Sequence, residues 1–335
     1  MSLSMDETVF GKKELLQILK SVSDRCVIIG PVMEDEKLYF RPVDCIDDIV
    51  WEFDNTVNSI KEFFFPQRQA LYELKQDKIR TFEPDIEKKR ILLFPRPCDV
   101  RAVTILDKLF MGDYEDRAYR TLRENTVIMG LSCRNPGPRC FCLSIGGNPF
   151  GMEGMDVSIT ALENDKYILN TVTDRGKVIF EGKGKRADKE EVQRFERLKK
   201  QAEESIKREI HIPKDLLKAF ESDYWKEVSE ACLKCGVCTY LCPTCHCFDI
   251  VDERFYRIRC WDTCSSDAFT RMASGEDSRK NKFKRYRQRI YHKFSYYKEN
   301  FEEYACVGCG RCAQYCPVKT DIVEIVSTVN EKGTP

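Results

Sequence analysis

The sequence predicts an α+β protein, in which an N-terminal α/β domain precedes a cysteine-rich helical domain. Three observations support this prediction. Apolar stretches alternate with helical patterns over the first half of the chain. A highly charged helical pattern follows at residues 187–208, and two dense cysteine runs lie in the last third. We therefore expect an α/β domain at residues 1–186, a helical linker at residues 187–228 and the cysteine-rich domain at residues 229–335.

The first 90 residues contain patterns of both element types. Residues 12–22 place their leucines and isoleucine on one helical face. Residues 26–31 and 37–43 are short apolar stretches that are typical of strands. Cys26 and Cys45 have no metal-like spacing, so we interpret them as ordinary buried thiols.

An aromatic triplet, Phe63-Phe64-Phe65, lies within residues 57–75. Three consecutive aromatic side chains usually belong to a core, and they also suit the border of a cofactor site. We expect a helix after the triplet.

Two buried parallel strands are expected at residues 90–94 and 126–131, because both stretches are continuously apolar. A helical pattern at residues 100–110 follows the first strand, with Asp99 as its expected N-cap. Four cysteines come just after these two strands: Cys98, Cys133, Cys140 and Cys142. Ligands usually bind at this edge of an α/β sheet, so the four thiols are candidates for a shared metal centre.

The next segment, residues 156–185, is expected to form β-hairpins. The proposed strands include residues 177–180, after a turn at Asp174-Arg175-Gly176. Residues 187–208 are then expected to form a charged helix that joins the two domains.

The two cysteine runs have the same spacing. The first reads Cys232-Leu-Lys-Cys235-Gly-Val-Cys238-Thr-Tyr-Leu-Cys242-Pro243, and the second reads Cys306-Val-Gly-Cys309-Gly-Arg-Cys312-Ala-Gln-Tyr-Cys316-Pro317. Both match the pattern of two-cluster ferredoxins, in which the fourth cysteine of each run ligates the other cluster. We therefore assign one [4Fe-4S] cluster to Cys232, Cys235, Cys238 and Cys316, and a second to Cys306, Cys309, Cys312 and Cys242.

Structural zinc is the alternative, because zinc sites also use pairs of cysteines two residues apart. Zinc ribbons separate their two pairs by a spacer, whereas each run here has four cysteines in eleven residues and ends in Cys-Pro. Gly236, Gly308 and Gly310 would let the backbone turn toward a cluster without a Cβ clash. The last third of the chain is therefore expected to be an α-helical ferredoxin-type domain with two [4Fe-4S] clusters.

The four earlier cysteines (Cys98, Cys133, Cys140 and Cys142) are candidates for a third [4Fe-4S] cluster, with zinc or inert thiols as the alternatives. Gly146-Gly147 nearby would allow close approach of a flavin or a substrate, and it is equally typical of a turn.

The long segment between the two runs is expected to contain two or three helices. It includes Cys245, Cys247, Cys260 and Cys264, which we interpret either as a further metal site or as inert thiols that shield the clusters. Residues 279–298 are basic and aromatic. They predict a helix that packs its aromatic side chains inward, or a docking face for an acidic redox partner.

Charge and composition exclude several classes of protein. The 335 residues contain 55 Lys+Arg and 55 Asp+Glu, and this zero net charge argues against nucleic-acid and anionic-membrane binding. The first ten residues lack the pattern of a secretory signal, and no apolar run is long enough to span a bilayer. The 18 cysteines, clustered at metal-ligand spacings, therefore indicate thiolates in a reducing cytoplasm rather than disulfides. Three histidines make His-based metal sites an unfavoured choice.

The order of these motifs carries a resemblance to a known family. The motifs are Arg96-Pro97-Cys98-Asp99, Cys140-Phe-Cys142, the first run continued through Cys245 and Cys247, Trp261 with Cys264, the basic residues 284–287, and the second run. Over roughly residues 55–330 the chain resembles a dicluster iron–sulfur family. That family includes an iron–sulfur subunit of anaerobic sulfite reductase and the β subunit of cytoplasmic sulfhydrogenases.

The resemblance implies an electron-transfer subunit that performs no catalysis alone. Its partners would be an FAD/NAD(P)-binding subunit and a terminal reductase, hydrogenase or heterodisulfide-reductase-like subunit. Two other functions stay open on the residues. One is a catalytic subunit that binds flavin near Cys98 and Gly146-Gly147, and the other is a non-enzymatic iron–sulfur sensor.

Overall fold

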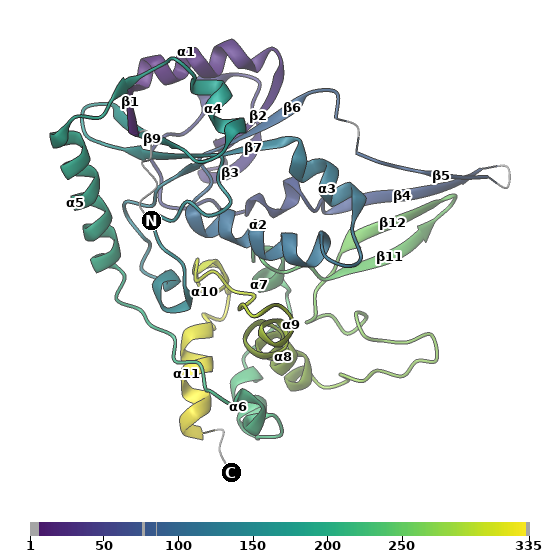
Figure 1. Cartoon of the computed structure of the whole chain (residues 1–335). Helices are drawn as coiled ribbons and strands as arrows, with labels where there is room; N and C mark the ends of the chain where they lie inside the picture. Colours follow the sequence, from purple (N-terminus) through teal and green to yellow (C-terminus); the bar gives the residue numbers. More distant parts are fainter. Residues whose placement is uncertain (1–6, 76–77, 85, 333–335) are drawn as a thin grey trace.

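The computed structural model describes residues 7–75, 78–84 and 86–332, and it has the expected α+β architecture (Figure 1). Residues 1–6 and 333–335, at the outer ends of the expected ranges 1–186 and 229–335, lie outside the described residues. The first ten residues, which lack the pattern of a secretory signal, are therefore described only from residue 7 onward. None of the described helices has the length and apolar character needed to cross a membrane.

A mixed eight-stranded sheet forms the scaffold of the N-terminal half. Its strand order is β10-β1-β9-β8-β7-β6-β2-β3, and the central strands β2, β6, β7 and β8 are parallel. The strands are β1 (Glu7–Gly11), β2 (Cys26–Glu34), β3 (Lys37–Pro42), β6 (Lys89–Leu93), β7 (Thr126–Leu131), β8 (Val157–Ala161), β9 (Lys166–Thr171) and β10 (Lys185–Arg186). The strands expected at residues 90–94 and 126–131 are confirmed as parallel neighbours.

Helices cover both faces of this sheet (Figure 1). Because side chains alternate along a strand, Ile91 and Leu93 of β6 face the core around α1, whereas Leu92 faces the core around α2. The helices are α1 (Lys12–Ser23) and α4 (Asp174–Phe180) on one face, and α2 (Pro97–Phe110) and α3 (Arg117–Glu124) on the other. Short 3-10 helices lie at Ile46–Asp48, Ile60–Phe63 and Cys142–Ile145.

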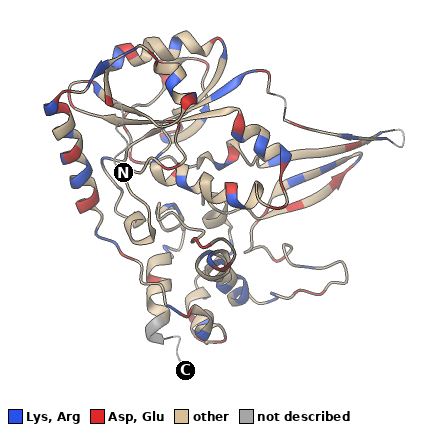
Figure 2. Ribbon diagram, viewed as in Figure 1, with Lys and Arg blue, Asp and Glu red and all other residues tan. Residues whose placement is uncertain are grey.

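The charged helix expected at residues 187–208 is confirmed as α5 (Lys189–Ser205). Asp188 caps it in a capping box with Glu191, which satisfies free N–H groups of its first turn. Its apolar face packs Phe195 and Leu198 against Phe150. Figure 2 shows that basic and acidic residues alternate along the rest of this helix.

The C-terminal third folds around a further apolar cluster, which includes Trp225, Tyr291 and Val326. Phe141 and Ile145 of the N-terminal half also belong to this cluster. The helices of the C-terminal third are η4 (Leu216–Ala219), α6 (Tyr224–Ser229), α7 (Val237–Tyr240), α8 (Lys282–Tyr291), the π-helical turn η5 (His292–Tyr296), α9 (Tyr297–Phe301), α10 (Arg311–Gln314) and α11 (Ile322–Lys332). The segments α8, η5 and α9 follow one another without a break.

A second, four-stranded antiparallel sheet is built from two stretches that are far apart in the chain. Its order is β11-β12-β4-β5, with β4 (Arg68–Lys75) and β5 (Lys78–Thr81) from the N-terminal half. The other two strands are β11 (Phe248–Glu253) and β12 (Tyr256–Trp261). Figure 1 shows this sheet projecting from the body of the protein.

Three expectations about elements are wrong, and a fourth is incomplete. The helix expected after the aromatic triplet is the strand β4, because its residues pair with β12. The strand expected at residues 177–180 belongs to helix α4, which Thr173 caps through its side chain. The long segment between the cysteine runs contains the expected helices, α8, η5 and α9, and also a β-hairpin that was not predicted. Asp99 lies inside the first turn of α2, whose N-cap is Arg96.

Candidate iron-sulfur centres

The two cysteine runs adopt the same local structure. In each run a glycine with positive φ, Gly236 at 77° and Gly310 at 74°, precedes a helix of four residues, α7 or α10. An L-residue would be strained in this conformation, and glycine adopts it freely. The two short helices contact one another. The equal spacing of the runs therefore produces two similar cysteine loops, side by side.

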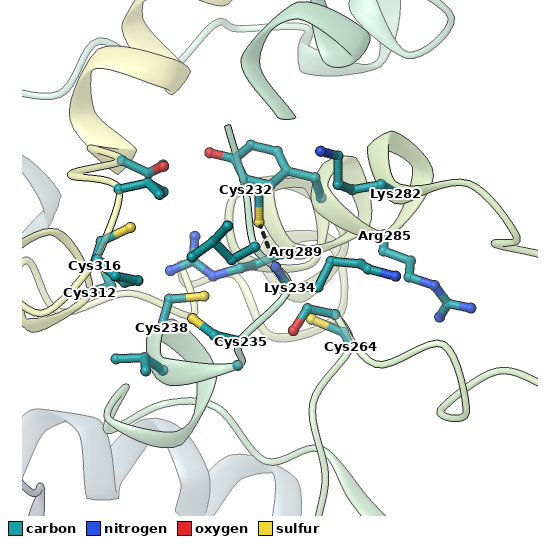
Figure 3. Close-up of a pocket in the computed structure, with 18 of the residues that line it drawn as sticks. Cys232, Lys234, Cys235, Cys238, Cys264, Lys282, Arg285, Arg289, Cys312 and Cys316 are labelled. Atoms are coloured by element: carbon teal, nitrogen blue, oxygen red, sulfur yellow. Dashed lines mark hydrogen bonds between the residues drawn. The ribbon is translucent and has the colours of Figure 1, made fainter. Parts of the chain in front are cut away.

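The cysteines of the first predicted set meet at one cavity, which we call the C-terminal cavity (Figure 3). Its lining includes six cysteines: Cys232, Cys235, Cys238, Cys264, Cys312 and Cys316. The first three come from one loop, whereas Cys316 comes from the other run. The structure thus brings together the four thiols that the crossed ligand pattern requires, and it adds Cys264 and Cys312 to their surroundings.

The burial and charge of Arg289 on α8 indicate whether this cavity suits a [4Fe-4S] cluster. Its side chain is buried and reaches among the cysteines, whereas Arg285 points away from them (Figure 3). Within the described residues, its Nε and Nη2 have no hydrogen-bond partner. Burial alone would lower the pKa of Arg289, but the thiolate charges of Cys238 and Cys312 raise it above its usual value. A buried cation without a partner is costly, so the cavity suits an anionic group such as a thiolate-bound cluster.

The second predicted set lies deeper in the protein. Cys306 and Cys242 are both buried, and burial raises the pKa of Cys306 to about 11. The charge of Lys293 opposes this rise, whereas the charges of Cys242 and Cys312 contribute to it. Lys293 supplies a compensating charge, with its Nζ 3.2 Å from the Cys242 Sγ and 2.9 Å from the Ala305 carbonyl oxygen.

The third predicted set lies at the C-terminal edge of β6 and β7. Cys98, Cys133 and Cys140 line a cavity of about 570 Å³, which we call the sheet-edge cavity. The chain enters it through Phe94, whose φ of 64° turns it sharply out of β6. Cys142 lines an adjacent cavity that also contacts Cys98. Burial, then the charges of Cys140 and Cys133, raise the pKa of Cys142 to about 12.

Comparison with known proteins gives two matches for this arrangement. Residues 231–320, which contain both cysteine runs, match the family described as a 4Fe-4S dicluster domain. Over 315 residues, the chain is 30% identical to sulfhydrogenase 2 subunit beta of Pyrococcus furiosus. This alignment spans 91% of the chain and 92% of that relative. No solved structure gives a significant match.

The chain belongs to the sulfhydrogenase β-subunit family. It is therefore an iron–sulfur protein that transfers electrons, with [4Fe-4S] clusters in its dicluster domain. The match over nearly the full length of both chains also covers the N-terminal half, where the sheet-edge cavity lies.

In this sulfhydrogenase β-subunit homologue, the second cysteine run also reaches the sheet-edge cavity. Cys309 lines that cavity together with Cys98, Cys133 and Cys140, while Cys312 from the same run lines the C-terminal cavity. The Cys140 thiol lies 3.8 Å from the carbonyl oxygen of Cys309. Sequence spacing contains no signal for this neighbourhood, because the two segments are about 170 residues apart.

Glycines allow the second run to approach residues 139–142 this closely. A Cβ added to Gly308 would lie 2.6 Å from the Cα and backbone N of Cys142, and one on Gly310 would lie 2.7 Å from Arg139 backbone atoms. The Phe141 N–H donates to the Gly308 carbonyl oxygen at 2.9 Å. Both glycines were expected to face a cluster, and the structure shows that they also allow two loops to interlock.

A fully buried ion pair joins the same two regions of this family member. Arg311 of α10 donates to both carboxylate oxygens of Asp99 on α2, at 2.7 and 2.8 Å. Neither side chain has any solvent-exposed area. Asp99, expected to be a helix cap, instead holds the second cysteine loop against the helix that carries Cys98.

The basic aromatic segment is a buried part of the C-terminal core. Arg285, Arg287, Arg289 and Lys293 are each less than a tenth exposed, like the neighbouring Ile290 and Tyr291. The expected inward packing of the aromatic side chains is confirmed, because Tyr286, Tyr291 and Phe294 are buried in the same core. The alternative, a docking face, is wrong for these four basic residues, since their side chains are not exposed. Their charges instead face the cysteines and nearby carboxylates.

The remaining cysteines divide into three kinds. Cys245 hydrogen-bonds to Cys242, and Cys264 hydrogen-bonds to Cys247. Cys260 on β12 lies 3.9 Å from the Asp249 carbonyl oxygen. Cys26 is partly buried and Cys45 is exposed, so the expectation of a buried thiol is wrong for Cys45. Throughout the described part of the chain, no three His, Cys, Asp or Glu side chains converge as a single metal ion requires.

Proposed function

We propose that the chain is the iron–sulfur relay subunit of a cytoplasmic redox complex. It passes electrons between an FAD/NAD(P)-binding subunit and a terminal subunit of the sulfite reductase, hydrogenase or heterodisulfide reductase type. The name of the Pyrococcus relative describes a β subunit of a sulfhydrogenase, which supports a multi-subunit assembly.

We infer three [4Fe-4S] clusters in this relay. The C-terminal cavity would use Cys232, Cys235, Cys238 and Cys316. The central site would use Cys306, Cys309, Cys312 and Cys242. The third cluster would use Cys98, Cys133 and Cys140 of the sheet-edge cavity, together with Cys142 from the adjacent cavity. The observation that carries this proposal is the position of the second run, whose Cys309 and Cys312 border the two outer cavities. A central cluster held there would lie between the other two.

The residues around the thiols suit this role. When bound, [4Fe-4S] clusters supply one-electron redox chemistry at potentials set by charge, hydrogen bonds and burial. Arg289 and Lys293 offset thiolate charge at the first two sites. At the third, the buried Arg96 lines the cavity and donates to the Ser132 carbonyl oxygen at 2.8 Å. Each group thus favours an anionic site away from water.

The cavity beside Gly146 and Gly147 favours a relay over a flavin enzyme. Its volume is about 160 Å³, and Arg101 and Glu153 also line it. Ligand pockets usually have a volume of roughly 300–1,000 Å³, so this space is small for a flavin. A yellow colour that stays with the purified chain would instead support the flavin-binding alternative.

Iron analysis of the anaerobically purified chain tests the number of clusters. Three [4Fe-4S] clusters predict about twelve irons per chain, and two predict about eight. Cys133→Ser and Cys140→Ser should each lower the content by about four irons, because each removes one proposed ligand of the sheet-edge site. Cys45→Ser is the matched control, since Cys45 is exposed and lies outside all three sets. About eight irons in the unmodified protein would exclude the third cluster.

Dye reduction tests the relay itself. The complete complex should reduce a viologen dye with NAD(P)H, whereas the isolated chain with its full iron content should not. Dye reduction by the isolated chain would show that it has its own pyridine-nucleotide site. Loss of the reaction in a complex that lacks only this chain would support the relay.

A further inference from the structure

Two thiols outside the proposed ligand sets meet at the base of the β11–β12 hairpin. Cys247 directly precedes β11, and Cys264 follows the end of β12. The Asp262 N–H donates to the Cys247 carbonyl oxygen at 3.0 Å, which extends the ladder one residue beyond the Phe248–Trp261 pair. The hairpin therefore fixes the two cysteines beside one another, although 16 intervening residues separate them in the sequence.

The contact between these cysteines is direct. The thiol and the backbone N–H of Cys264 both donate to the Cys247 Sγ. These hydrogen bonds, and behind them the charges of Lys293 and Lys61, lower the pKa of Cys247. In this arrangement Cys247 is the better nucleophile, because the thiolate is the reactive form of cysteine, and Cys264 is the resolving thiol.

Space for a reacting molecule lies next to the pair. Cys247 and Cys264 both line a cavity of about 360 Å³, which we call the hairpin cavity, together with His292 and Arg279. Cys247 is partly buried and Cys264 is buried. A molecule in this cavity would therefore meet Cys247 first.

We propose that Cys247 and Cys264 form a redox-active thiol pair that exchanges with a small organic disulfide. The Cys247 thiolate attacks one sulfur of the disulfide RSSR, forms a mixed disulfide and releases RS⁻. Cys264 then attacks the Cys247 sulfur, which closes the Cys247–Cys264 disulfide and releases the second RS⁻. The thiol proton of Cys264 and the proton that Cys247 lost on ionisation convert the two RS⁻ to RSH. The thiol pair loses two electrons and RSSR gains them.

The position of Cys264 gives this exchange a consequence for the proposed relay. Cys264 lines both the hairpin cavity and the C-terminal cavity. Closing the disulfide removes an ionisable thiol from the wall of the C-terminal cavity. A link between thiol oxidation and that site rests on the proposed function, whereas the exchange itself requires only the two cysteines.

Mass spectrometry of the whole, anaerobically purified protein tests the pair, with oxidised glutathione as the disulfide. After incubation, free thiols are blocked in denaturant, disulfides are reduced, and the released thiols take a second label. Cys247 and Cys264 should lose the first label together and gain the second. In Cys264→Ser, Cys247 should instead carry a glutathione adduct. In Cys247→Ser, Cys264 should stay free, because the attacking thiolate is gone.

Iron content distinguishes this proposal from the proposed clusters. Cys260→Ser is the matched control, since Cys260 lies on the same hairpin, and it should leave the Cys247–Cys264 exchange unchanged. Cys247→Ser should keep the iron content of the unmodified protein. Free Cys247 and Cys264 after treatment of the unmodified protein, or loss of iron in Cys247→Ser, would overturn the thiol pair. A low iron content in the unmodified protein would count against the clusters and would leave the labelling result valid.

Discussion

Buried cations among the cysteines are the main electrostatic feature at the scale of single residues. Arg289 reaches into the C-terminal cavity, Lys293 contacts Cys242, and Lys61 donates to the Cys245 carbonyl oxygen at 2.9 Å. Burial lowers the pKa of Lys61, and the surrounding thiolates oppose that change. Each cation costs free energy to bury unless an anion balances it. These side chains therefore set the local potential as well as the local packing.

Removing the charge of Arg289 should make the cluster of the C-terminal cavity harder to reduce. In Arg289→Met, the reduced and more negative state loses more stabilisation than the oxidised state. We expect its midpoint potential to fall by tens of millivolts, since ~59 mV corresponds to ~1.4 kcal/mol for one electron. An EPR-monitored redox titration measures this shift.

Lys282→Met provides the comparison for Arg289→Met. Lys282 lies on the same helix and lines the same cavity, but it is only partly buried and donates to the Glu230 carbonyl oxygen. Solvent screens such a charge, so its removal should shift the potential less. Equal shifts in the two variants would contradict a specific role for Arg289.

Part of the residue-level picture follows from the sequence alone. The cysteine spacing predicted which thiols of the first set share a cavity. It did not predict the burial of Arg289 and Lys293, because a basic, aromatic stretch is usually a solvated helix face. Only the packing of α8 and η5 inside the C-terminal core places these charges beside the thiols.

At the scale of elements, the interlocked loops around Gly308 control how the second cysteine run is placed. Gly308 has a φ of 65°, and a Cβ there would clash with the backbone of Cys142. Gly308→Ala should therefore destabilise the protein by ~2–4 kcal/mol, through left-handed strain and overpacking together. Iron content should also fall, because the two cysteine loops must separate. Anaerobic urea denaturation and iron analysis measure both effects.

Gly182→Ala separates the two causes. Gly182 has a φ of 68°, and a Cβ there meets no atom of the described residues within 4 Å. This variant should lose only the strain energy, about 1–2 kcal/mol, and keep its iron. Similar losses in both variants would show that the loop contact adds nothing.

The two misassigned segments show why element prediction was incomplete. Residues 68–75 form a strand only because β12 pairs with them from far along the chain. Residues 174–180 have a turn-like start, but Thr173 provides a helix cap through its side chain. Local pattern was sufficient for β6, β7 and α5, where buried apolar residues or charge periodicity dominate.

At the scale of the whole molecule, the N-terminal and C-terminal parts are joined by buried contacts. The proposed boundaries at residues 186 and 228 stay a prediction. Arg311 and Asp99 pair across the parts without solvent contact, and Arg311 also donates to the Thr56 carbonyl oxygen at 3.0 Å. A pair of this kind is weak evidence for net stability, but loss of one partner leaves an uncompensated charge.

Asp99→Asn should therefore destabilise the protein by about 3–5 kcal/mol. Asp223→Asn is the matched control, because its ion pair with Lys226 is exposed and should contribute less than ~1 kcal/mol. Urea denaturation under anaerobic conditions measures both changes. A double variant, Asp99→Leu with Arg311→Met, should recover part of the loss, since it removes both charges. No recovery would show that the pair has a role beyond charge balance.

The sheet β11-β12-β4-β5 has a consequence for how this gene can change. One hairpin is encoded before residue 82 and the other after residue 247, yet β4 and β12 pair as neighbouring strands of one sheet. Recombination between two homologous genes at any point in the intervening 166 codons would join hairpins of different ancestry. In most such hybrids, β4 and β12 would come from different parent proteins, and their side chains would fit poorly where the two strands pair. We therefore expect these two segments to be inherited together, with viable hybrids exchanging both or neither.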